Sequence, residues 1–194
     1  MNPVSITGLV LAGGAGSRMG GKDKGLVPYL GKPLISYSIN TLKLHTNKIL
    51  INANRNLELY RTFGFQVITD LSKDRLGPLG GIKAGLCHCR TDILMVVSCD
   101  TPDLPNDLIK NLYFALIEGN FDFAMPYTTD SLNEKRTHPS TMMIRTGLGQ
   151  SLDNYLSTGQ RKIDRWTETL NGVEVRFENH SEFKNVNYTD DLKK

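Results

Sequence analysis

Short apolar runs rich in β-branched residues alternate with segments of helical pattern along this chain of 194 residues. The first run, from Ile6 to Leu11, ends at a pair of glycines. Runs with the same strand character follow at 48–53, 66–69, 93–98 and 121–125. Helical patterns lie between them at 33–42, 57–63, 80–89 and 105–117, the first and last opening on a proline. This alternation predicts an α/β fold with three α/β/α layers, in which right-handed crossovers build a mostly parallel sheet.

The regular alternation ends after Tyr127. A polar stretch at 128–137 precedes a further strand pattern at 140–144 and a helix pattern at 148–156. At this length one domain is the simpler expectation, and no linker or repeat divides the chain. We therefore expect a single domain over 1–194, with one half at 1–126 and a second half at 127–194 that covers one end of the sheet.

The charge balance limits the classes of partner. Lys and Arg number 23 and Asp and Glu 20, so the net charge of +3 predicts neither nucleic acid nor a membrane as partner, whereas small acidic molecules need only a local basic patch. The N-terminus lacks the pattern of a secretory signal, and no apolar run approaches membrane-spanning length. We expect a cytoplasmic protein.

Three cysteines, Cys87, Cys89 and Cys99, are an odd number in a chain without a secretory signal, so a disulfide framework is not expected. The Cys87-His88-Cys89 cluster suggests a metal site, but three ligands within three residues hardly reach one ion together. The alternative that we favour is a pair of reduced, partly buried thiols at a helix end.

A glycine-rich segment from Leu11 to Lys24 directly follows the first strand pattern. It holds five glycines and three cationic side chains, namely Arg18, Lys22 and Lys24. Glycines allow backbone N–H groups to approach an anion closely, and cationic side chains neutralise the remaining charge. The segment therefore predicts phosphate binding; the alternative is a flexible turn with solvated charges.

Two common phosphate-binding motifs nearly match this segment, and both fail at one residue. The dinucleotide fingerprint fails because Met19 occupies the place of its third glycine. The phosphate-loop pattern fails because Asp23 replaces the hydroxyl residue that would bind magnesium. The role of Lys22, beside Asp23, stays open between phosphate contact and solvent.

The order Leu-Ala-Gly-Gly, spacer, Arg-Met-Gly and lysine, followed by Gly-Lys-Pro-Leu at 31–34, resembles the signature of nucleotidyltransferases with a phosphorylated acceptor. Further matching pieces lie at 51–55, 70, 77–81, 99–102, 138–139, 159–162 and 185–187. In order and spacing they are most similar to the molybdenum cofactor guanylyltransferases, the MobA-type family, over nearly the whole chain. The resemblance implies a fold like that of the nucleotide-diphospho-sugar transferases.

The resemblance also implies a reaction. In that family GMP passes from GTP to the phosphate of molybdopterin, pyrophosphate leaves, and the molybdopterin guanine dinucleotide cofactor forms. The expected partners are GTP and molybdopterin, with or without molybdenum, together with proteins of molybdenum insertion and molybdoenzyme maturation. The half at 1–126 would bind the nucleotide and the half at 127–194 the acceptor.

Asp100 follows an apolar run at 93–99 and precedes a turn at Thr101-Pro102, so it should lie at the carboxyl end of a strand. A carboxylate there suits Mg²⁺, which bridges triphosphate oxygens. The alternative role, capping the helix that begins near Pro105, suits Asp103 better. The resemblance implies that Asp100 is the metal ligand and that Mg²⁺ is the cofactor, with Arg18, Lys24 and Asp100 as the catalytic residues.

The remaining site residues are also implied by the resemblance. Contacts to GTP are expected from Leu11, Ala12, Gly13, Lys24, Asn52, Asp70 and Asp100. Contacts to the acceptor are expected from His138, Arg161, Lys162, Asn185 and Asn187. The alternatives are an Asx turn for Asn52, a surface carboxylate for Asp70, a core imidazole for His138, and the start of a solvated helix for Arg161 and Lys162.

Three other functions stay open at this point. Leu-Ala-Gly-Gly resembles the guanylyl branch of the molybdopterin enzymes more than the cytidylyl branch, which favours GTP over CTP. Transfer of a nucleotide to a sugar phosphate is compatible with the same N-terminal segment, so the second half must discriminate. A non-catalytic nucleotide-binding module would need no carboxylate at Asp100.

Overall fold

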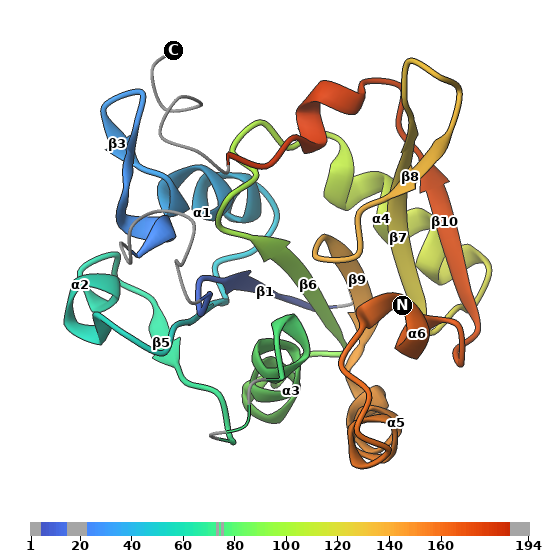
Figure 1. Cartoon of the computed structure of the whole chain (residues 1–194), viewed down its shortest axis with the longest axis horizontal. Helices are drawn as coiled ribbons and strands as arrows, with labels where there is room; N and C mark the ends of the chain where they lie inside the picture. Colours follow the sequence, from blue (N-terminus) through green and yellow to red (C-terminus); the bar gives the residue numbers. More distant parts are fainter. Residues whose placement is uncertain (1–4, 15–22, 73, 75, 187–194) are drawn as a thin grey trace.

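The computed structural model describes residues 5–14, 23–72, 74 and 76–186. A central sheet runs through the molecule, with helices on both faces (Figure 1). Its strand order is β10-β7-β9-β6-β1-β4-β5, and β8 pairs with the outer part of β7. Strands β6, β1, β4 and β5 are parallel, and β9 runs antiparallel to both β6 and β7. This is the mostly parallel three-layer α/β arrangement that the sequence predicts.

The strands of the main sheet are β1 (Ile6–Leu11), β4 (Ile49–Asn52), β5 (Gln66–Ile68), β6 (Ile93–Ser98), β7 (Phe123–Thr129), β8 (Lys135–Thr137), β9 (Met142–Arg145) and β10 (Gly172–Arg176). A separate hairpin pairs β2 (Pro28–Tyr29) with β3 (Lys32–Pro33).

The α-helices are α1 (Ile35–Lys43), α2 (Leu57–Arg61), α3 (Pro78–His88), α4 (Leu108–Glu118), α5 (Gly149–Ser157) and α6 (Ile163–Thr167). Short 3-10 helices are η2 (Lys24–Leu26), η3 (Thr146–Leu148) and η4 (His180–Phe183).

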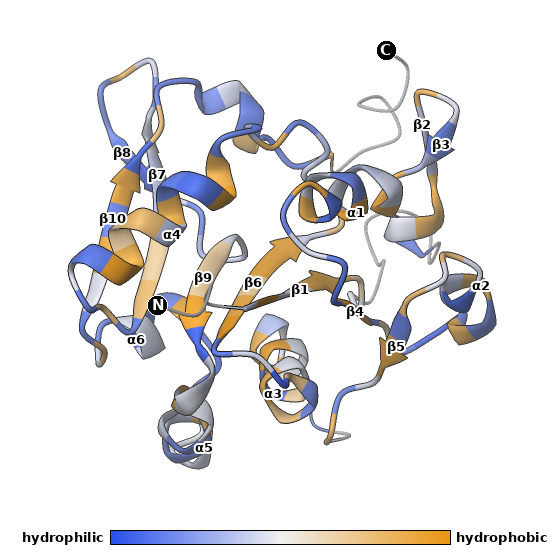
Figure 2. Cartoon of the chain, turned by 180° about the vertical axis from the view of Figure 1, so that it is seen from behind, coloured by the Kyte–Doolittle hydropathy of each residue, from blue (hydrophilic) through white to orange (hydrophobic). Residues whose placement is uncertain are grey.

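The core has two parts because successive side chains of a strand point to opposite faces of the sheet. On one face, Val10 and Met95 pack with the apolar sides of α1 and α4. On the other face, Leu9 and Leu94 pack with α3, α5 and α6, including the fully buried Trp166. Residues of β1 and β6 belong to both parts of the core, as a buried parallel strand requires, and Figure 2 colours most of these two strands as hydrophobic.

Several sequence predictions differ from the structure at the ends of elements. Pro33 lies in β3 and α1 begins at Ile35, so this proline does not open the helix. Pro105 lies in a turn before α4, whose N-cap is Asp107, whereas α3 does begin with a proline, at Pro78. The polar stretch after Tyr127 contains the end of β7 and all of β8. These strands pair as a hairpin, and its charged side chains face solvent, which is why the stretch has no apolar strand pattern.

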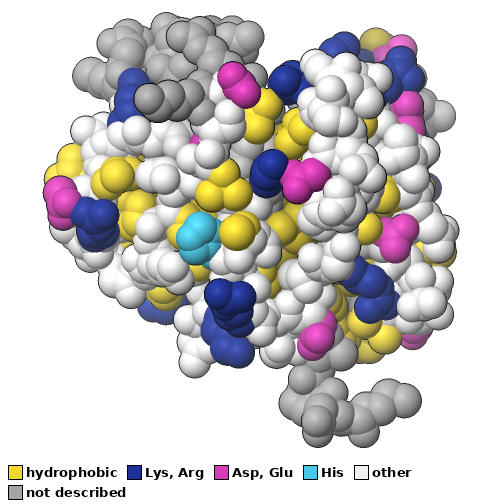
Figure 3. Space-filling model, turned by 90° about the horizontal axis from the view of Figure 1, so that it is seen from below, with side chains coloured by type: hydrophobic (Ala, Val, Ile, Leu, Met, Phe, Trp, Pro, Cys, Tyr) yellow, Lys and Arg dark blue, Asp and Glu magenta, His cyan; other side chains and the backbone are white. Residues whose placement is uncertain are grey.

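The surface of the described residues mixes charges of both signs. On the face shown in Figure 3, basic and acidic side chains are interspersed among apolar and neutral ones. This matches the small net charge of the chain. Among the helices of the described ranges, none combines the length and the apolar character needed to cross a bilayer.

Candidate active site

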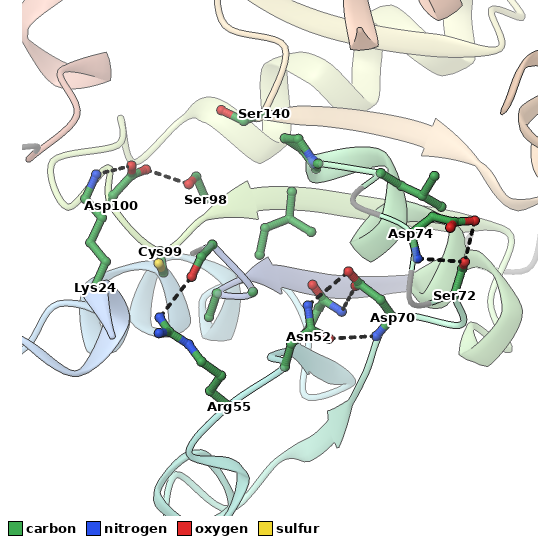
Figure 4. Close-up of a pocket in the computed structure, with 18 residues that line it drawn as sticks. Lys24, Asn52, Arg55, Asp70, Ser72, Asp74, Ser98, Cys99, Asp100 and Ser140 are labelled. Atoms are coloured by element: carbon green, nitrogen blue, oxygen red, sulfur yellow. Dashed lines mark hydrogen bonds and ion pairs between the residues drawn. The ribbon is translucent and has the colours of Figure 1, made fainter. Parts of the chain in front are cut away.

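A cavity of about 770 Å³ opens at the carboxyl ends of β1, β4, β5 and β6 (Figure 4). Because these strands are parallel, the loops that follow them meet at one edge of the sheet, where ligands of such sheets bind. Its lining residues are Leu11, Ala12, Gly13, Gly14, Lys24, Asn52, Asn54, Arg55, Asp70, Ser72, Asp74, Leu76, Gly77, Pro78, Ser98, Cys99, Asp100 and Ser140. Leu11 to Gly14 and Lys24 of the glycine-rich segment thus lie in the wall of this cavity.

Asp100 lies at one end of the cavity, just after β6. Its Oδ2 accepts a hydrogen bond from Lys24 Nζ at 2.5 Å, and its Oδ1 accepts one from Ser98 Oγ at 2.5 Å. Both members of the ion pair are largely buried, with side chains of Lys24 and Asp100 exposed by 20% and 15%. A cation and a carboxylate held together in a cavity wall can bind phosphate and a divalent metal side by side.

Asn52 and Asp70 lie side by side in the wall that β4 and β5 form. Asn52 Nδ2 donates to Asp70 Oδ1 and Asn54 Nδ2 to Asp70 Oδ2, both at 2.9 Å, while the Asp70 backbone N–H donates to Asn54 Oδ1 at 3.0 Å. Asn52 is almost fully buried. These bonds hold a polar group of fixed orientation in the cavity wall, and the contact of the pair with a nucleotide stays a prediction.

Two glycines, which have no side chain, make room for the amide groups of Asn52 and Asn54. A Cβ at Gly81, on α3, would lie 2.4 Å from Asn52 Oδ1, and a Cβ at Gly13 would lie 2.8 Å from Asn54 Nδ2. Atoms do not approach so closely, so any larger residue there would displace the amides. The glycines are therefore required by the close approach of helix and loop to the site.

Arg55 extends toward the glycine-rich segment from the loop after β4. Its Nη2 donates to the carbonyl oxygen of Gly14 at 3.1 Å. The contact links the end of the described part of this segment to the Asn52 side of the cavity and adds a cation to its wall.

Asp23 has a structural role that explains its place in the glycine-rich segment. Its carboxylate accepts hydrogen bonds from Tyr60 Oη at 2.6 Å and Asn56 Nδ2 at 3.2 Å, and the residue is buried. Burial, together with the bond to this carboxylate, raises the pKa of Tyr60. Asp23 therefore anchors the segment to α2 and is absent from the lining of the cavity that would receive phosphate.

The residues at Asp100 fit a magnesium ion that shares its ligands with a substrate. Mg²⁺ is commonly held by one or two carboxylates together with phosphate oxygens and water. Asp100 offers one carboxylate in the cavity, and within the described ranges no three His, Cys, Asp or Glu side chains cluster as a metal site. The donor set suits Mg²⁺ bound with a polyphosphate, and it does not suit a metal held by protein alone.

The cysteines are free thiols in the structure. Cys87 is exposed and Cys89, the residue that ends α3, is buried with its Sγ 3.1 Å from Thr91 Oγ1. Cys89 is thus buried at the end of the helix as expected, whereas Cys87 is exposed. Cys99 is buried beside Asp100, where desolvation raises the pKa of its thiol.

A second, smaller cavity of about 280 Å³ adjoins the first. It is lined by Thr101, Thr137, His138, Pro139, Ser140, Thr141, Phe183 and Asn185. Ser140 lines both cavities, and Asp100 and Thr101 are adjacent residues that line the first and the second. The two cavities therefore meet beside the end of β6.

His138 is held firmly in the wall of the second cavity. Its Nε2 lies 2.9 Å from Thr128 Oγ1, which also lies 2.8 Å from His180 Nδ1, and its ring stacks on Phe183 with centroids 4.4 Å apart. Burial and, to a smaller extent, the nearby His180 lower the pKa of His138 to about 4. His138 is thus a neutral imidazole at physiological pH that lines a cavity.

Asn185 reaches the second cavity from the C-terminal segment. Its Oδ1 accepts a hydrogen bond from Thr101 Oγ1 at 2.9 Å, and the next residue, Val186, donates its N–H to the Asp100 carbonyl oxygen at 2.8 Å. These bonds tie the end of the described chain to the loop that carries Asp100.

The structure brings together most of the residues expected at the site. Leu11, Ala12, Gly13, Lys24, Asn52, Asp70 and Asp100 line the first cavity, and His138 and Asn185 line the second. Arg18, Lys22 and Asn187 lie outside the described residues.

Arg161 and Lys162 line neither cavity. Arg161 Nη1 donates to the carbonyl oxygens of Leu156 and Gln160, and the Lys162 carbonyl oxygen accepts a hydrogen bond from Tyr155 Oη. These bonds hold both residues against the end of α5, and Lys162 precedes the first turn of α6. Their contact with an acceptor remains a prediction.

Among the lining residues to which the sequence assigned no role are Asn54, Arg55, Ser98 and Ser140. Asn54 and Arg55 lie in the matched segment at 51–55, two and three residues after Asn52, and this proximity was the available indication. Ser98 ends the strand pattern that carries Asp100. Ser140 reaches the site only through the pairing of β9, which lies far along the chain.

The chain is similar to known proteins in sequence and in fold. The model of the MobA-like NTP transferase domain matches residues 8–173. The chain is 43% identical to the molybdenum cofactor guanylyltransferase of Cupriavidus metallidurans, covering 96% of this chain and 92% of that protein. Among solved structures, molybdopterin-guanine dinucleotide biosynthesis protein A from Archaeoglobus fulgidus superposes with a TM-score of 0.75 at 24% identity, covering 96% of this chain and 95% of that one. CMP:2-keto-3-deoxy-manno-octonic acid synthetase, complexed with CTP, superposes with a TM-score of 0.77 at 12% identity, covering 97% and 95%.

Proposed function

Because the chain belongs to the MobA-like NTP transferase family, we propose that it transfers GMP from GTP to the phosphate of molybdopterin. Pyrophosphate is the second product, and the molybdopterin guanine dinucleotide cofactor is the first. The observation that carries the proposal is the junction of two cavities beside the Lys24–Asp100 pair, because a transfer reaction needs two substrates that meet at one phosphorus.

The first cavity takes GTP in this proposal. Backbone groups of Leu11, Ala12 and Gly13 and the Asn52–Asp70 pair contact the nucleoside, and the triphosphate extends toward Lys24 and Asp100. Lys24 neutralises phosphate charge, and Arg18 of the same segment is proposed to do so as well. The family relationship favours guanine over cytosine.

The chain's residues act on the reaction mainly by alignment and charge. The acceptor phosphate is already an anion, so its attack on the α-phosphorus needs little general-base catalysis. Asp100 would hold Mg²⁺ with the triphosphate oxygens, and such an ion offsets their charge and polarises the α-phosphorus. Lys24 holds the Asp100 carboxylate in place and carries positive charge beside the transferred group.

The second cavity takes the acceptor. Neutral His138 and the amide of Asn185 both donate and accept hydrogen bonds, which suits a pterin ring. Asn187, Arg161 and Lys162 are proposed as further contacts to the acceptor. Proteins of molybdenum insertion and molybdoenzyme maturation are the proposed partners before and after the transfer, in the cytoplasm.

The decisive experiment measures pyrophosphate release from GTP and Mg²⁺ with and without added molybdopterin. We expect release that depends on molybdopterin and yields the dinucleotide. Binding of GTP, ATP, CTP and UTP is compared by thermal shift, since a ligand selective for the native state raises the melting temperature. A preference for CTP would favour cytidylyl transfer instead, and release driven by a sugar phosphate alone would contradict the choice of acceptor.

A further inference from the structure

We propose that Ser140 contacts the transferred phosphoryl group, donating hydrogen bonds from its backbone N–H and its hydroxyl as the acceptor phosphate attacks. This inference rests on the proposed function and adds to it a residue that the sequence comparison did not assign. It begins from position: of the described residues, Ser140 alone lines both the first and the second cavity. A side chain at this place borders both substrates.

A tight turn holds Ser140 in place. The Thr141 N–H donates to the His138 carbonyl oxygen at 2.9 Å, which closes a four-residue turn with Pro139 in its second position. Both ends of the turn are anchored: the His138 ring contacts Thr128 and Phe183, and Thr141 is buried at the start of the β9 segment. Ser140 is therefore presented on a rigid element, as a group that acts on a transition state must be.

The donors of Ser140 have no acceptor within the described residues. The hydrogen bond that closes the turn uses the N–H of Thr141, and neither the N–H nor the hydroxyl of Ser140 bonds to another described group. The residue is half-buried and faces both cavities. Two adjacent donors without acceptors, at the edge of a cavity that also holds Lys24, suit the non-bridging oxygens of a phosphoryl group.

The position of Ser140 relative to the proposed nucleoside contacts also suits this role. Figure 4 shows it across the cavity from Asn52 and Asp70. With the nucleoside at Asn52 and Asp70, the α-phosphoryl group would lie between that pair and the second cavity. Ser140 borders the path by which an acceptor in the second cavity reaches it.

The step is an in-line displacement. An oxygen of the acceptor phosphate forms a bond to the α-phosphorus, the bond from that phosphorus to the bridging oxygen of pyrophosphate breaks, and pyrophosphate leaves with the electron pair. Ser140 neither gains nor loses a proton. Its donors stabilise negative charge on the α-phosphoryl oxygens while the two phosphates approach each other.

The test compares Ser140→Ala with Ser140→Thr, which keeps the hydroxyl, and with Ser157→Ala, a serine at the exposed end of α5 outside both cavities. Ser140→Ala removes the hydroxyl that donates to the charged phosphoryl group. We expect kcat to fall by about 10- to 100-fold, because the contact forms in the transition state. The Kd for GTP should change by less than about twofold. Ser140→Thr should recover most of kcat, and Ser157→Ala should match the wild type.

Several results would overturn the inference. A folded Ser140→Ala protein with wild-type kcat would do so, as would a loss of kcat that parallels loss of GTP binding. In the wild type, the amide proton resonance of Ser140 should shift downfield when GTP, Mg²⁺ and molybdopterin are added; an unchanged resonance counts against the contact even if the variant does not fold. The wild-type assay separates the two proposals, since absence of acceptor-dependent pyrophosphate release refutes the proposed function itself.

Discussion

Lys24 Nζ lies 2.5 Å from Asp100 Oδ2, although 76 residues separate the two in the chain. The glycine-rich segment after β1 and the loop after β6 are neighbours because β1 and β6 pair in parallel, from Ile6 opposite Ile93 to Leu11 opposite Ser98. The pair thus depends on the register of two central strands. It places a cation and a carboxylate where both substrates are proposed to meet.

Replacing Asp100 with alanine should abolish turnover while the fold persists. We expect pyrophosphate release to fall by at least about 10³-fold, because the proposed ligand of Mg²⁺ and the partner of Lys24 are both lost. Removing one partner of a buried ion pair costs about 3–5 kcal/mol, and the 20% exposure of the Lys24 side chain should place the loss of unfolding free energy at the lower end of that range. Rates and circular dichroism of the same preparation check both statements.

Asp153→Ala is the matched control, because Asp153 forms a partly exposed ion pair with Lys83 between α5 and α3 and lines neither cavity. It should retain wild-type turnover. A folded Asp100→Ala protein with near-normal pyrophosphate release would refute the role of Asp100.

Chelation of divalent cations should stop transfer by the wild type. With EDTA in excess, acceptor-dependent release of pyrophosphate should fall to the background rate, and Mg²⁺ added beyond the chelator should restore it. Asp100→Asn should not recover under the same addition. Transfer that continues at its full rate in EDTA would show that no metal is needed.

The layers of the fold could be predicted because the central strands are apolar on both faces. The runs 6–11 and 93–98 match β1 and β6 to the residue, since no charged side chain interrupts them and the one polar residue inside them, Thr7, is β-branched and buried. By contrast, β10 has three half-buried residues and two exposed charged ones, and β8 is a charged hairpin strand. Such edge strands form because a neighbour offers hydrogen bonds, and a local pattern does not reveal that.

The residues of the candidate site also fall into two groups, those that a local sequence pattern predicts and those that it does not. Asn52 ends β4, Asp70 and Asp100 lie two residues beyond β5 and β6, and Lys24 ends the glycine-rich segment after β1. A parallel sheet therefore collects these four side chains at one edge. Ser140 depends on the antiparallel insertion of β9 between β6 and β7, which sequence spacing does not encode. Arg161 is implied as an acceptor contact by the family resemblance; its hydrogen bonds hold it at the end of α5, outside the lining of both cavities, and the contact stays a prediction.

Replacing Gly81 with alanine should weaken GTP binding. The new Cβ would lie 2.4 Å from Asn52 Oδ1 and 2.7 Å from Leu11 Cδ2, so both lining residues must move. Overpacking of this kind costs about 1–3 kcal/mol of stability. We expect the Kd for GTP to rise by at least about tenfold, as for loss of a hydrogen bond to the nucleoside. Isothermal titration measures it.

Gly147→Ala is the control for this experiment, because a Cβ at Gly147 meets nothing within 4 Å and its backbone is not left-handed. It should bind GTP like the wild type. Equal affinity in both variants would show that Asn52 does not contact the nucleotide.

Asp70→Ala should also weaken GTP binding, through a different cause. The carboxylate holds the amides of Asn52 and Asn54, and without it both can rotate. We expect the Kd for GTP to rise by about 10-fold or more. Asp130→Ala, in the hairpin between β7 and β8, removes a carboxylate outside both cavities and should leave binding unchanged. If the two variants bind GTP equally well, Asp70 has no part in the site.

Protonation of His138 should destabilise the protein in acid. Burial first, and His180 second, lower the pKa of His138 to about 4, from an ordinary value of 6.5. The unfolded chain therefore binds this proton more readily than the folded one. The contribution to stability is fully present above pH 6.5 and is lost as the pH falls toward 4. The free energy of unfolding, measured with denaturant between pH 6.5 and pH 4, should decline more steeply for the wild type than for His138→Gln. The difference in slope should correspond to the uptake of at most one proton.

His45→Gln removes an exposed imidazole after α1 and should keep the wild-type slope. Identical slopes for His138→Gln and the wild type would mean that His138 titrates normally and is not held as a neutral ring against Thr128 and Phe183.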